Sequence, residues 1–164
     1  SRGTIFFKQE RVGLHGRKFY QYKLRSMIAD AEEIKDQYRH LNEQSGPAFK
    51  IKDDPRLTKV GKFMRKYSID ELPQLFNILI GSMTLIGPRP PVPSEVAEYR
   101  DNHLHRLSMK PGITGLWQVS GRNTVKEFDK WVQLDLEYID HWSFGLDFKI
   151  ALKTVSTVFS GSGM

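Results

Sequence analysis

Residues 68–90 have the sequence SIDELPQLFNILIGSMTLIGPRP, and this stretch determines how the rest of the chain is interpreted. Two adjacent carboxylates, Asp70 and Glu71, open it, and a Gly-Pro-Arg-Pro turn that contains Arg89 closes it. No charged residue lies between Glu71 and Arg89. Acids before a long apolar segment, with an arginine after it, suit a phosphate-handling site beside an apolar surface. The same pattern also suits an ordinary capped helix that enters a core.

The start of this segment supports two interpretations. Ser68-x-x-Glu71 matches a capping box, which predicts that Asp70 and Glu71 lie in a first helical turn. Pro73 conflicts with a cap at Ser68, so either the cap lies one or two residues later or the helix bends there. In the structural interpretation Glu71 completes the cap and Asp70 complements the helix dipole. In the catalytic one, one carboxylate is a nucleophile or base and the other binds a metal, while the helix N-terminus keeps Asp70 ionised and offers N–H groups to a phosphoryl group.

The composition of the 164 residues predicts one globular domain, residues 1–164, because 39% are hydrophobic and 27% are charged. The absence of cysteine excludes disulfides and thiolate metal sites, and it fits a reducing compartment. A formal charge of +6 and a pI near 9.5 favour anionic partners such as phosphates, nucleic acid or an anionic membrane. Residues 72–88 are uncharged but interrupted by polar residues, proline and glycine, which predicts a buried or interfacial helix followed by a turn rather than a span.

Local patterns predict an α+β fold that is mostly helical with an N-terminal β-hairpin. The hairpin is expected over 5–11 and 17–25, which are rich in aromatic and β-favouring residues and flank two glycines. We expect an extended loop over 87–93 and a turn-rich break over 110–115. Helical patterns occupy residues 27–42, 58–66, 68 onward, 94–107, the stretch from the capping box Thr124-x-x-Glu127 to about 142, and 146–159.

The last two predicted helices carry the expected apolar anchors. The first of them has Phe128, Trp131, Val132, Tyr138 and Ile139, and the second sets Ile150, Leu152, Val155 and Phe159 against Lys149 and Lys153.

Several cations are candidate phosphate ligands. Lys23 ends the predicted hairpin, Arg65 lies just before the acids, and Arg122 precedes the Thr124 cap. Solvated surface charges are the alternative for each. Arg89 stands apart, since a rigid proline-rich loop aims its guanidinium and suits bidentate phosphate binding. With no Walker loop, dinucleotide fingerprint or zinc-spaced histidines, a metal would be a hard ion, Mg²⁺ held by one or two carboxylates and substrate phosphates.

Two functional hypotheses follow, an enzyme and a non-enzymatic basic module that binds anionic membrane or nucleic acid. A binding module should tolerate loss of Asp70, whereas an enzyme should not. Binding of nucleic acid would favour aromatic residues interleaved with basic ones on an exposed face. Trp131, Tyr138 and Trp142 instead follow the spacing of a helix core. We therefore expect no nucleic-acid partner.

Several blocks of the sequence, taken in order, resemble the bacterial sugar transferase family. These enzymes are the polyprenyl-phosphate hexose-1-phosphate transferases, which are monotopic phosphoglycosyl transferases. Residues 91–96 and the C-terminal helices are similar to the long members of the family that initiate polymers. The matching blocks are residues 6–13, 22–27, 65–74, 87–90 and 110–123.

The resemblance implies that a UDP-sugar gives its sugar-1-phosphate to undecaprenyl phosphate, which starts a capsule, exopolysaccharide or O-antigen. Asp70 corresponds to the family's nucleophile, which takes the phospho-sugar covalently and releases UMP. Glu71 corresponds to the residue that helps to hold Mg²⁺. The active-site cations of the family correspond to Lys23, Arg65, Arg89 and Arg122.

The resemblance also implies a location on the cytoplasmic face of the bacterial inner membrane. Family members carry a membrane-entering segment just before the first hairpin, and this sequence begins where that segment would end. We therefore expect the 164 residues by themselves to attach weakly, with residues 72–86 and the last helix against the membrane. Glucose and galactose both remain open as the sugar, and the sequence indicates no oligomeric state.

Overall fold

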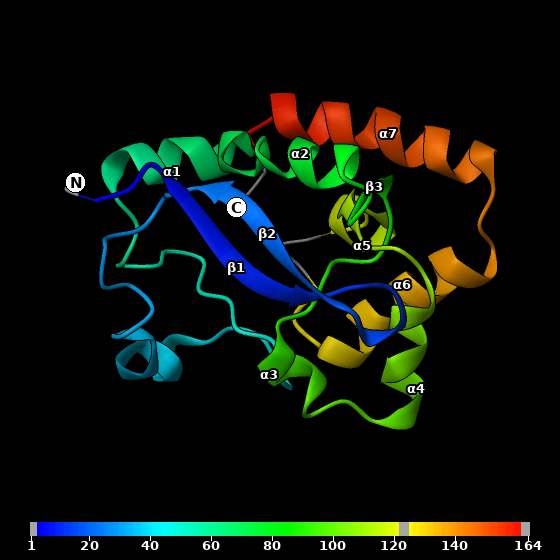
Figure 1. Cartoon of the computed structure of the whole chain (residues 1–164), viewed down its shortest axis with the longest axis horizontal. Coiled ribbons are helices and arrows are strands. Elements are labelled where there is room, and N and C mark those ends of the chain that lie inside the picture. Colours follow the sequence, from blue (N-terminus) through cyan, green and yellow to red (C-terminus); the bar gives the residue numbers. More distant parts are fainter. Residues whose placement is uncertain (1–2, 122–124, 162–164) are drawn as a thin grey trace.

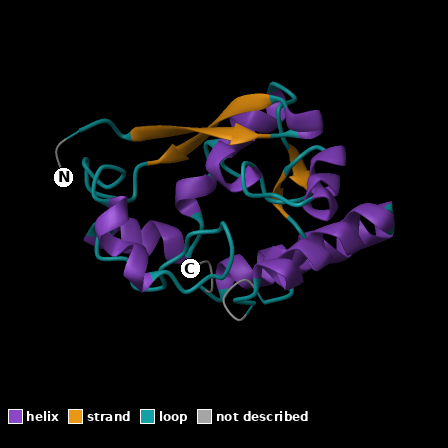
Figure 2. Cartoon of the chain, turned by 90° about the horizontal axis from the view of Figure 1, so that it is seen from below, coloured by secondary structure: helices purple, strands orange, loops and turns teal. Residues whose placement is uncertain are grey.

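The computed structural model describes residues 3–121 and 125–161. The predicted hairpin is confirmed: strand β1, Phe6–Val12, pairs antiparallel with β2, Lys18–Leu24. The connection includes the short 3-10 turn η1, Leu14–Gly16, in which His15 and Gly16 have φ angles of 54° and 78°. The hairpin forms a long ribbon along one side of the molecule (Figures 1 and 2).

A second pair of strands was not predicted. Strand β3, Thr84–Ile86, pairs in parallel with β4, Gly112–Thr114, where the sequence indicated a turn-rich break. The two segments approach so closely that a Cβ atom on Gly112 would lie 2.1 Å from the backbone nitrogen of Gly87. The glycines that suggested a turn therefore allow two backbones to meet. A short helix, α5, Leu116–Val119, follows β4 directly.

The helix over 58–66 is confirmed, but the capping box at Ser68 is wrong. Helix α1, Lys59–Lys66, begins where the hydroxyl of Thr58 accepts a hydrogen bond from the backbone of Gly61. Ser68 has a left-handed φ of 55° and makes no capping bond. The acids lie in a 3-10 turn, η3, Ile69–Glu71, and helix α2, Gln74–Leu79, begins only after Pro73. The proline ends one turn and starts the next because its ring excludes a continuous helix.

Two predicted helices were wrong in extent. Within residues 27–42 the structure has turns and one 3-10 element, η2, Lys35–Leu41. This segment is tied to a distant one by the backbone bond from Ile28 to Arg56, which overrides its weak helical pattern. The stretch 94–107 is divided into helix α3, Pro93–Val96, helix α4, Asp101–Leu104, and the 3-10 turn η4, His105–Ser108. Helix α4 begins after Arg100, whose backbone N–H donates a hydrogen bond to the side chain of His103. The loop that precedes α3 is irregular, as predicted.

The main core forms on helix α6, Phe128–Asp140, whose predicted cap at Thr124 lies outside the described residues. Trp131 stacks on Trp117 of α5 with ring centroids 4.0 Å apart. The predicted anchors are buried except for Ile139, which is partly buried, and Trp142, which follows the helix, is 46% exposed. The buried residues of this cluster are Ala48, Trp117, Phe128, Trp131 and Val132.

Helix α7, Phe144–Phe159, buries Ile150 but leaves Leu152, Val155 and Phe159 more than half exposed, so only one of its four predicted apolar anchors packs into the core. Helices α1, α2 and α7 lie along one edge of the molecule in Figure 1. Both α2 and α7 contact β3. Within the described ranges, none of the helices combines the length and apolar character needed to cross a bilayer. We call the exposed apolar side chains of these three helices, together with those of residues 72 and 80 beside α2 and residue 85 on β3, the apolar edge; they are Val60, Phe63, Leu72, Leu75, Phe76, Leu79, Ile80, Leu85, Phe144, Phe148, Leu152, Val155 and Phe159.

Candidate active site

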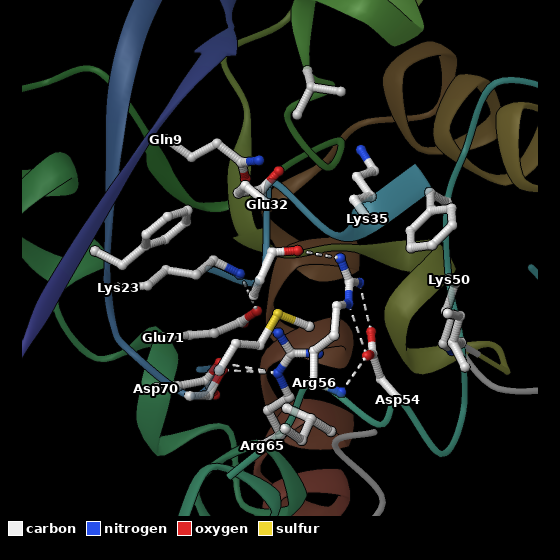
Figure 3. A pocket seen from close by; sticks show the side chains of 18 of the residues that line it. Gln9, Lys23, Glu32, Lys35, Lys50, Asp54, Arg56, Arg65, Asp70 and Glu71 are labelled. Atoms are coloured by element: carbon white, nitrogen blue, oxygen red, sulfur yellow. Dashed lines mark hydrogen bonds and ion pairs between the residues drawn. The ribbon is translucent and has the colours of Figure 1, made fainter. Parts of the chain in front are cut away.

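A pocket of about 300 Å³ brings together five of the six sequence-predicted site residues. Its walls come from the hairpin, the turn η3, the Gly-Pro-Arg-Pro loop and the segment between β2 and α1. Figure 3 labels side chains of the hairpin, of η3 and of that segment. The sixth predicted residue, Arg122, lies outside the described residues. The five that line the pocket are Lys23, Arg65, Asp70, Glu71 and Arg89.

The carboxylate pair is held between two cations. Asp70 is 5% exposed, and one of its carboxylate oxygens lies 4.0 Å from Nε of Arg65. Glu71 accepts a hydrogen bond from Nζ of Lys23 at 3.0 Å. The left-handed residue Ser68 reverses the chain between α1 and η3, so that Arg65 faces the carboxylate that follows it. Neighbouring charges, rather than the start of an α-helix, surround the pair.

Burial lowers the pKa of two basic groups that line the pocket, Lys23 and Arg11. It lowers the pKa of Lys23, while the carboxylate of Glu71 opposes that change. Burial, together with the charge of Arg89, lowers the pKa of Arg11 to about 9. An anionic ligand would oppose both shifts, because it favours the charged form of each group.

Arg11 is a site residue that the sequence reasoning missed. It lies on β1 with Phe7 and Gln9, and the alternation of side chains along a strand places all three on the pocket side. Its guanidinium donates to the carbonyl of Pro90 at 3.0 Å and to the side chain of Gln9 at 2.7 Å. Because side chains alternate along a strand, the strand predicted over 5–11 already placed Arg11 on one face with Phe7 and Gln9, a signal that the sequence reasoning did not use.

Contacts on several sides fix the position of Arg89. Its guanidinium lies 5.1 Å from the ring centroid of Trp131, and Nη1 is 3.6 Å from a carboxylate oxygen of Glu95. Its backbone carbonyl accepts a bond from Arg106, which is itself bound to the buried carboxylate of Asp135 at 2.6 Å. Arg89 thus lines the pocket with its guanidinium held beside Glu95 and Trp131, and its role as a phosphate ligand stays a prediction.

The pocket as a whole suits a polyanion. Nine cationic and five acidic side chains line it among the described residues. An excess of positive charge in a partly desolvated cleft attracts anions and strengthens their hydrogen bonds. A diphosphate group matches this balance better than a neutral ligand does.

A metal would have few protein ligands here. Among the described residues there is no cluster of three or more histidine or acidic side chains. Among the described residues that line the pocket, Asp70 and Glu71 are the two acids adjacent in the chain. This donor set fits Mg²⁺, which commonly takes one or two carboxylates together with substrate phosphates.

A small polar chamber of about 30 Å³ adjoins the pocket behind Glu71 and Lys23. Six of its lining residues carry a buried polar atom without a hydrogen-bond partner in the described structure. Both donors and acceptors are among these atoms, and the volume is sufficient for about one or two water molecules. The atoms are Arg11 Nε, Gln21 Oε1, Gln74 Nε2, Arg89 Nη1, Trp117 Nε1 and Gln118 Oε1.

The buried carboxylate of Asp70 and the partly buried one of Glu71 lie in a cation-rich pocket of a domain that also has an exposed apolar edge, and this combination suits substrates that are both phosphorylated and lipid-like. Comparison with known proteins identifies its family. The sequence profile of the bacterial sugar transferase family matches residues 1–161, and the chain belongs to this family.

Three named relatives illustrate the similarity. Galactosyl transferase CpsE of Streptococcus agalactiae is 53% identical over 161 residues, which cover 98% of this chain and 36% of that protein. Undecaprenyl-phosphate galactose phosphotransferase of Salmonella typhimurium is 45% identical over 98% of this chain and 34% of its own length. UDP-glucose:undecaprenyl-phosphate glucose-1-phosphate transferase of Xanthomonas campestris is 39% identical over 96% of this chain and 32% of its own length. The chain thus spans about a third of the length of these relatives.

Proposed function

We propose that the chain is the catalytic domain of an undecaprenyl-phosphate hexose-1-phosphate transferase. The observation that carries this proposal is the buried carboxylate of Asp70, which faces a cation-rich pocket between Arg65 and the Lys23–Glu71 pair. We infer the lipid acceptor, undecaprenyl phosphate, from the names of the Salmonella and Xanthomonas relatives. The Xanthomonas name also supplies the class of donor, a UDP-sugar.

The proposed reaction has two displacements at one phosphorus atom. A carboxylate oxygen of Asp70 attacks the sugar-bearing phosphorus of the UDP-sugar, and the bond to the bridging oxygen breaks, so that UMP leaves with the electron pair. A phosphate oxygen of undecaprenyl phosphate then attacks the same phosphorus and releases the carboxylate. The covalent aspartyl-phosphosugar lets a water-soluble donor and a lipid acceptor use the site in turn.

Side chains of this pocket would stabilise charge during both steps. Lys23, Arg65 and Arg89 line the pocket and offer donors to phosphoryl oxygens, and we assign the same role to Arg122. Glu71, with Asp70 beside it, would hold Mg²⁺, which supplies Lewis-acid stabilisation of phosphate charge when bound.

The apolar edge supports a location at the membrane. Its helices expose large apolar side chains that a water-facing surface would not need in such number. We place the domain on the cytoplasmic face of the bacterial inner membrane, where it meets the lipid acceptor, and propose that its product starts a capsule, exopolysaccharide or O-antigen. Nucleic acid is not among the proposed partners. Galactose is the first sugar to test, because the two more similar of these relatives carry galactose in their names.

The test is a donor screen with the protein in its membrane. UMP release is measured for each UDP-sugar in the presence of undecaprenyl phosphate, and the protein is then searched for trapped phospho-sugar by mass spectrometry. We expect a label on Asp70, and no turnover in Asp70→Asn although the variant folds. A label on another residue, or normal turnover in Asp70→Asn, would contradict the proposed mechanism.

A further inference from the structure

The segment between β2 and α1 forms the wall of the pocket that faces the carboxylate pair. In Figure 3, Lys35, Lys50 and Asp54 lie on one side of the pocket, and Asp70 and Glu71 lie on the other. We call the side chains of Lys35, Lys50, Lys52 and Arg56, all of which line the pocket, the basic wall.

A buried ion pair between Arg56 and Asp54 stabilises the basic wall within the protein itself. Arg56 donates to both carboxylate oxygens of Asp54, at 2.9 and 2.6 Å, and each side chain is 4% exposed. Although burial by itself would raise the pKa of Asp54, hydrogen bonds from Arg56 hold it below its ordinary value. Arg56 also donates to the carbonyl of Ala31 at 3.0 Å, which joins the two ends of the segment.

Asp54 balances the charge of Arg56, so the remaining charge of the wall comes from the lysines. Lys35 and Arg56 both lie over the ring of Phe49, at 5.2 and 5.3 Å from its centroid. Among the described lining residues of this segment, Glu32 is the other acid. The wall therefore has a net positive charge. This charge suits an anionic ligand such as a phosphate, whereas the hydroxyl groups of a neutral sugar would not need it.

Displacement at phosphorus requires that the leaving group lie roughly opposite the nucleophile. If Asp70 attacks from its side of the pocket, the departing group lies toward the opposite wall. In the proposed function, on which this inference rests, that group is UMP, whose phosphate gains negative charge as the bond breaks. A basic surface at that place stabilises the departing phosphate.

We propose that the basic wall is the subsite for the leaving nucleoside monophosphate, with Lys35 as a ligand of its phosphate, and that the hexose lies outside this wall. Lys35 thereby becomes a binding residue that the sequence resemblance did not assign. The chemical class that the wall recognises is a nucleotide phosphate.

The test uses the whole protein in its membrane and three competing probes: UMP, uridine and galactose-1-phosphate. The inhibition constant of each probe is measured against the UDP-sugar for the wild type, Lys35→Gln and Lys35→Arg. We expect Lys35→Gln to weaken UMP by about tenfold, since a charged hydrogen bond is lost, and to leave uridine and galactose-1-phosphate unchanged. Lys35→Arg should restore most of the UMP affinity. The control Lys130→Gln removes an exposed lysine that pairs with Glu127 outside the pocket, and it should change nothing.

The pattern of losses separates a phosphate ligand from a structural role. A structural defect would weaken uridine and UMP together, and that result would overturn the inference. Unchanged UMP affinity in Lys35→Gln would overturn it too, and a selective loss of galactose-1-phosphate would place the sugar at the wall instead. If the wild-type protein releases no UMP from any UDP-sugar, the proposed function itself is refuted. If the wild type turns over normally but the inhibition constants follow one of the contrary patterns above, only the proposed subsite is refuted.

Discussion

At the scale of single residues, the position of Arg89 depends on contacts with Trp131, Glu95 and Arg106 rather than on the rigidity of its loop alone. We expect Arg89→Lys to lower kcat/KM by a factor equivalent to about 1–3 kcal/mol, because lysine keeps the charge but loses the planar fork. Steady-state kinetics with the UDP-sugar measure this. Arg39→Lys, at an exposed position outside the pocket, is the control. Unchanged kinetics in Arg89→Lys would leave Arg89 with a structural role in its loop.

Glu71 is bound to Lys23, so a metal at this carboxylate would share it with the lysine. We expect Glu71→Gln to raise the Mg²⁺ concentration needed for half-maximal turnover, since a neutral amide is a weaker ligand for a hard ion. The change in Mg²⁺ requirement should exceed any effect on folding, which thermal unfolding of the same variant measures. The control is Glu98→Gln, at an exposed site. Full activity in excess chelator would rule out the metal.

The sequence predicted most of the candidate site because its residues occur in short, specific blocks. Lys23, Arg65, Asp70, Glu71 and Arg89 do line one pocket. The local reason given for Asp70 and Glu71 was wrong, since no α-helix begins at Ser68. Arg11 was missed because strand alternation places it on a face with Phe7 and Gln9, but only the tertiary fold makes that face a wall of the pocket and brings Arg11 to the Pro90 carbonyl.

At the scale of elements, the parallel pair β3–β4 places the Gly-Pro-Arg-Pro loop directly after β3. We expect Gly112→Ala to destabilise the protein strongly, by about 3 kcal/mol or more, because the new methyl group would lie 2.1 Å from a backbone nitrogen. Gly145→Ala is the matched control, since its Cβ would meet only one atom, at 4.0 Å, within helix α7. This control should stabilise by about 0.5–1 kcal/mol through helix propensity. Denaturant unfolding compares the two, and equal stabilities would contradict the close packing of these backbones.

Elements with strong local signals were predictable, and elements decided by distant contacts were not. The hairpin has β-favouring residues on both sides of two glycines, and α1 has a threonine cap, all within their own sequence. The pairing of β3 with β4 joins segments that are far apart in the chain, so neither segment carries the signal by itself. The stretch 27–42 was mistaken for a helix because its bond to Arg56 and its place on the pocket wall come from the tertiary fold.

At the scale of the whole molecule, the apolar edge predicts how the domain meets lipid. We expect these 164 residues to bind anionic liposomes weakly and to release in salt, since each nearby cation contributes about 1 kcal/mol at an anionic surface. Addition of a hydrophobic segment before residue 1 should make binding resistant to salt and raise turnover. Flotation with anionic and neutral liposomes measures the binding of the 164 residues alone and of the form with the added hydrophobic segment.

Variants test whether the apolar edge itself carries this binding. Leu79→Ser removes a side chain that is 84% exposed on α2 and should reduce flotation. Leu104→Ser, at a residue 45% exposed on α4, changes an apolar side chain outside this edge and should have no effect. If the 164 residues alone show no preference for anionic over neutral liposomes, the proposed docking through the apolar edge is wrong.

The polar chamber behind Glu71 has a consequence for the response of the protein to pressure. Pressure favours unfolding to the extent that unfolding eliminates empty internal volume. Cavities that stay empty are apolar, whereas this one is surrounded by glutamine, arginine and tryptophan polar atoms. Water that occupies it in the folded state returns to the solvent on unfolding with little change in volume. The chamber behind Lys23 and Glu71 should therefore hold water and contribute little to the volume change on unfolding.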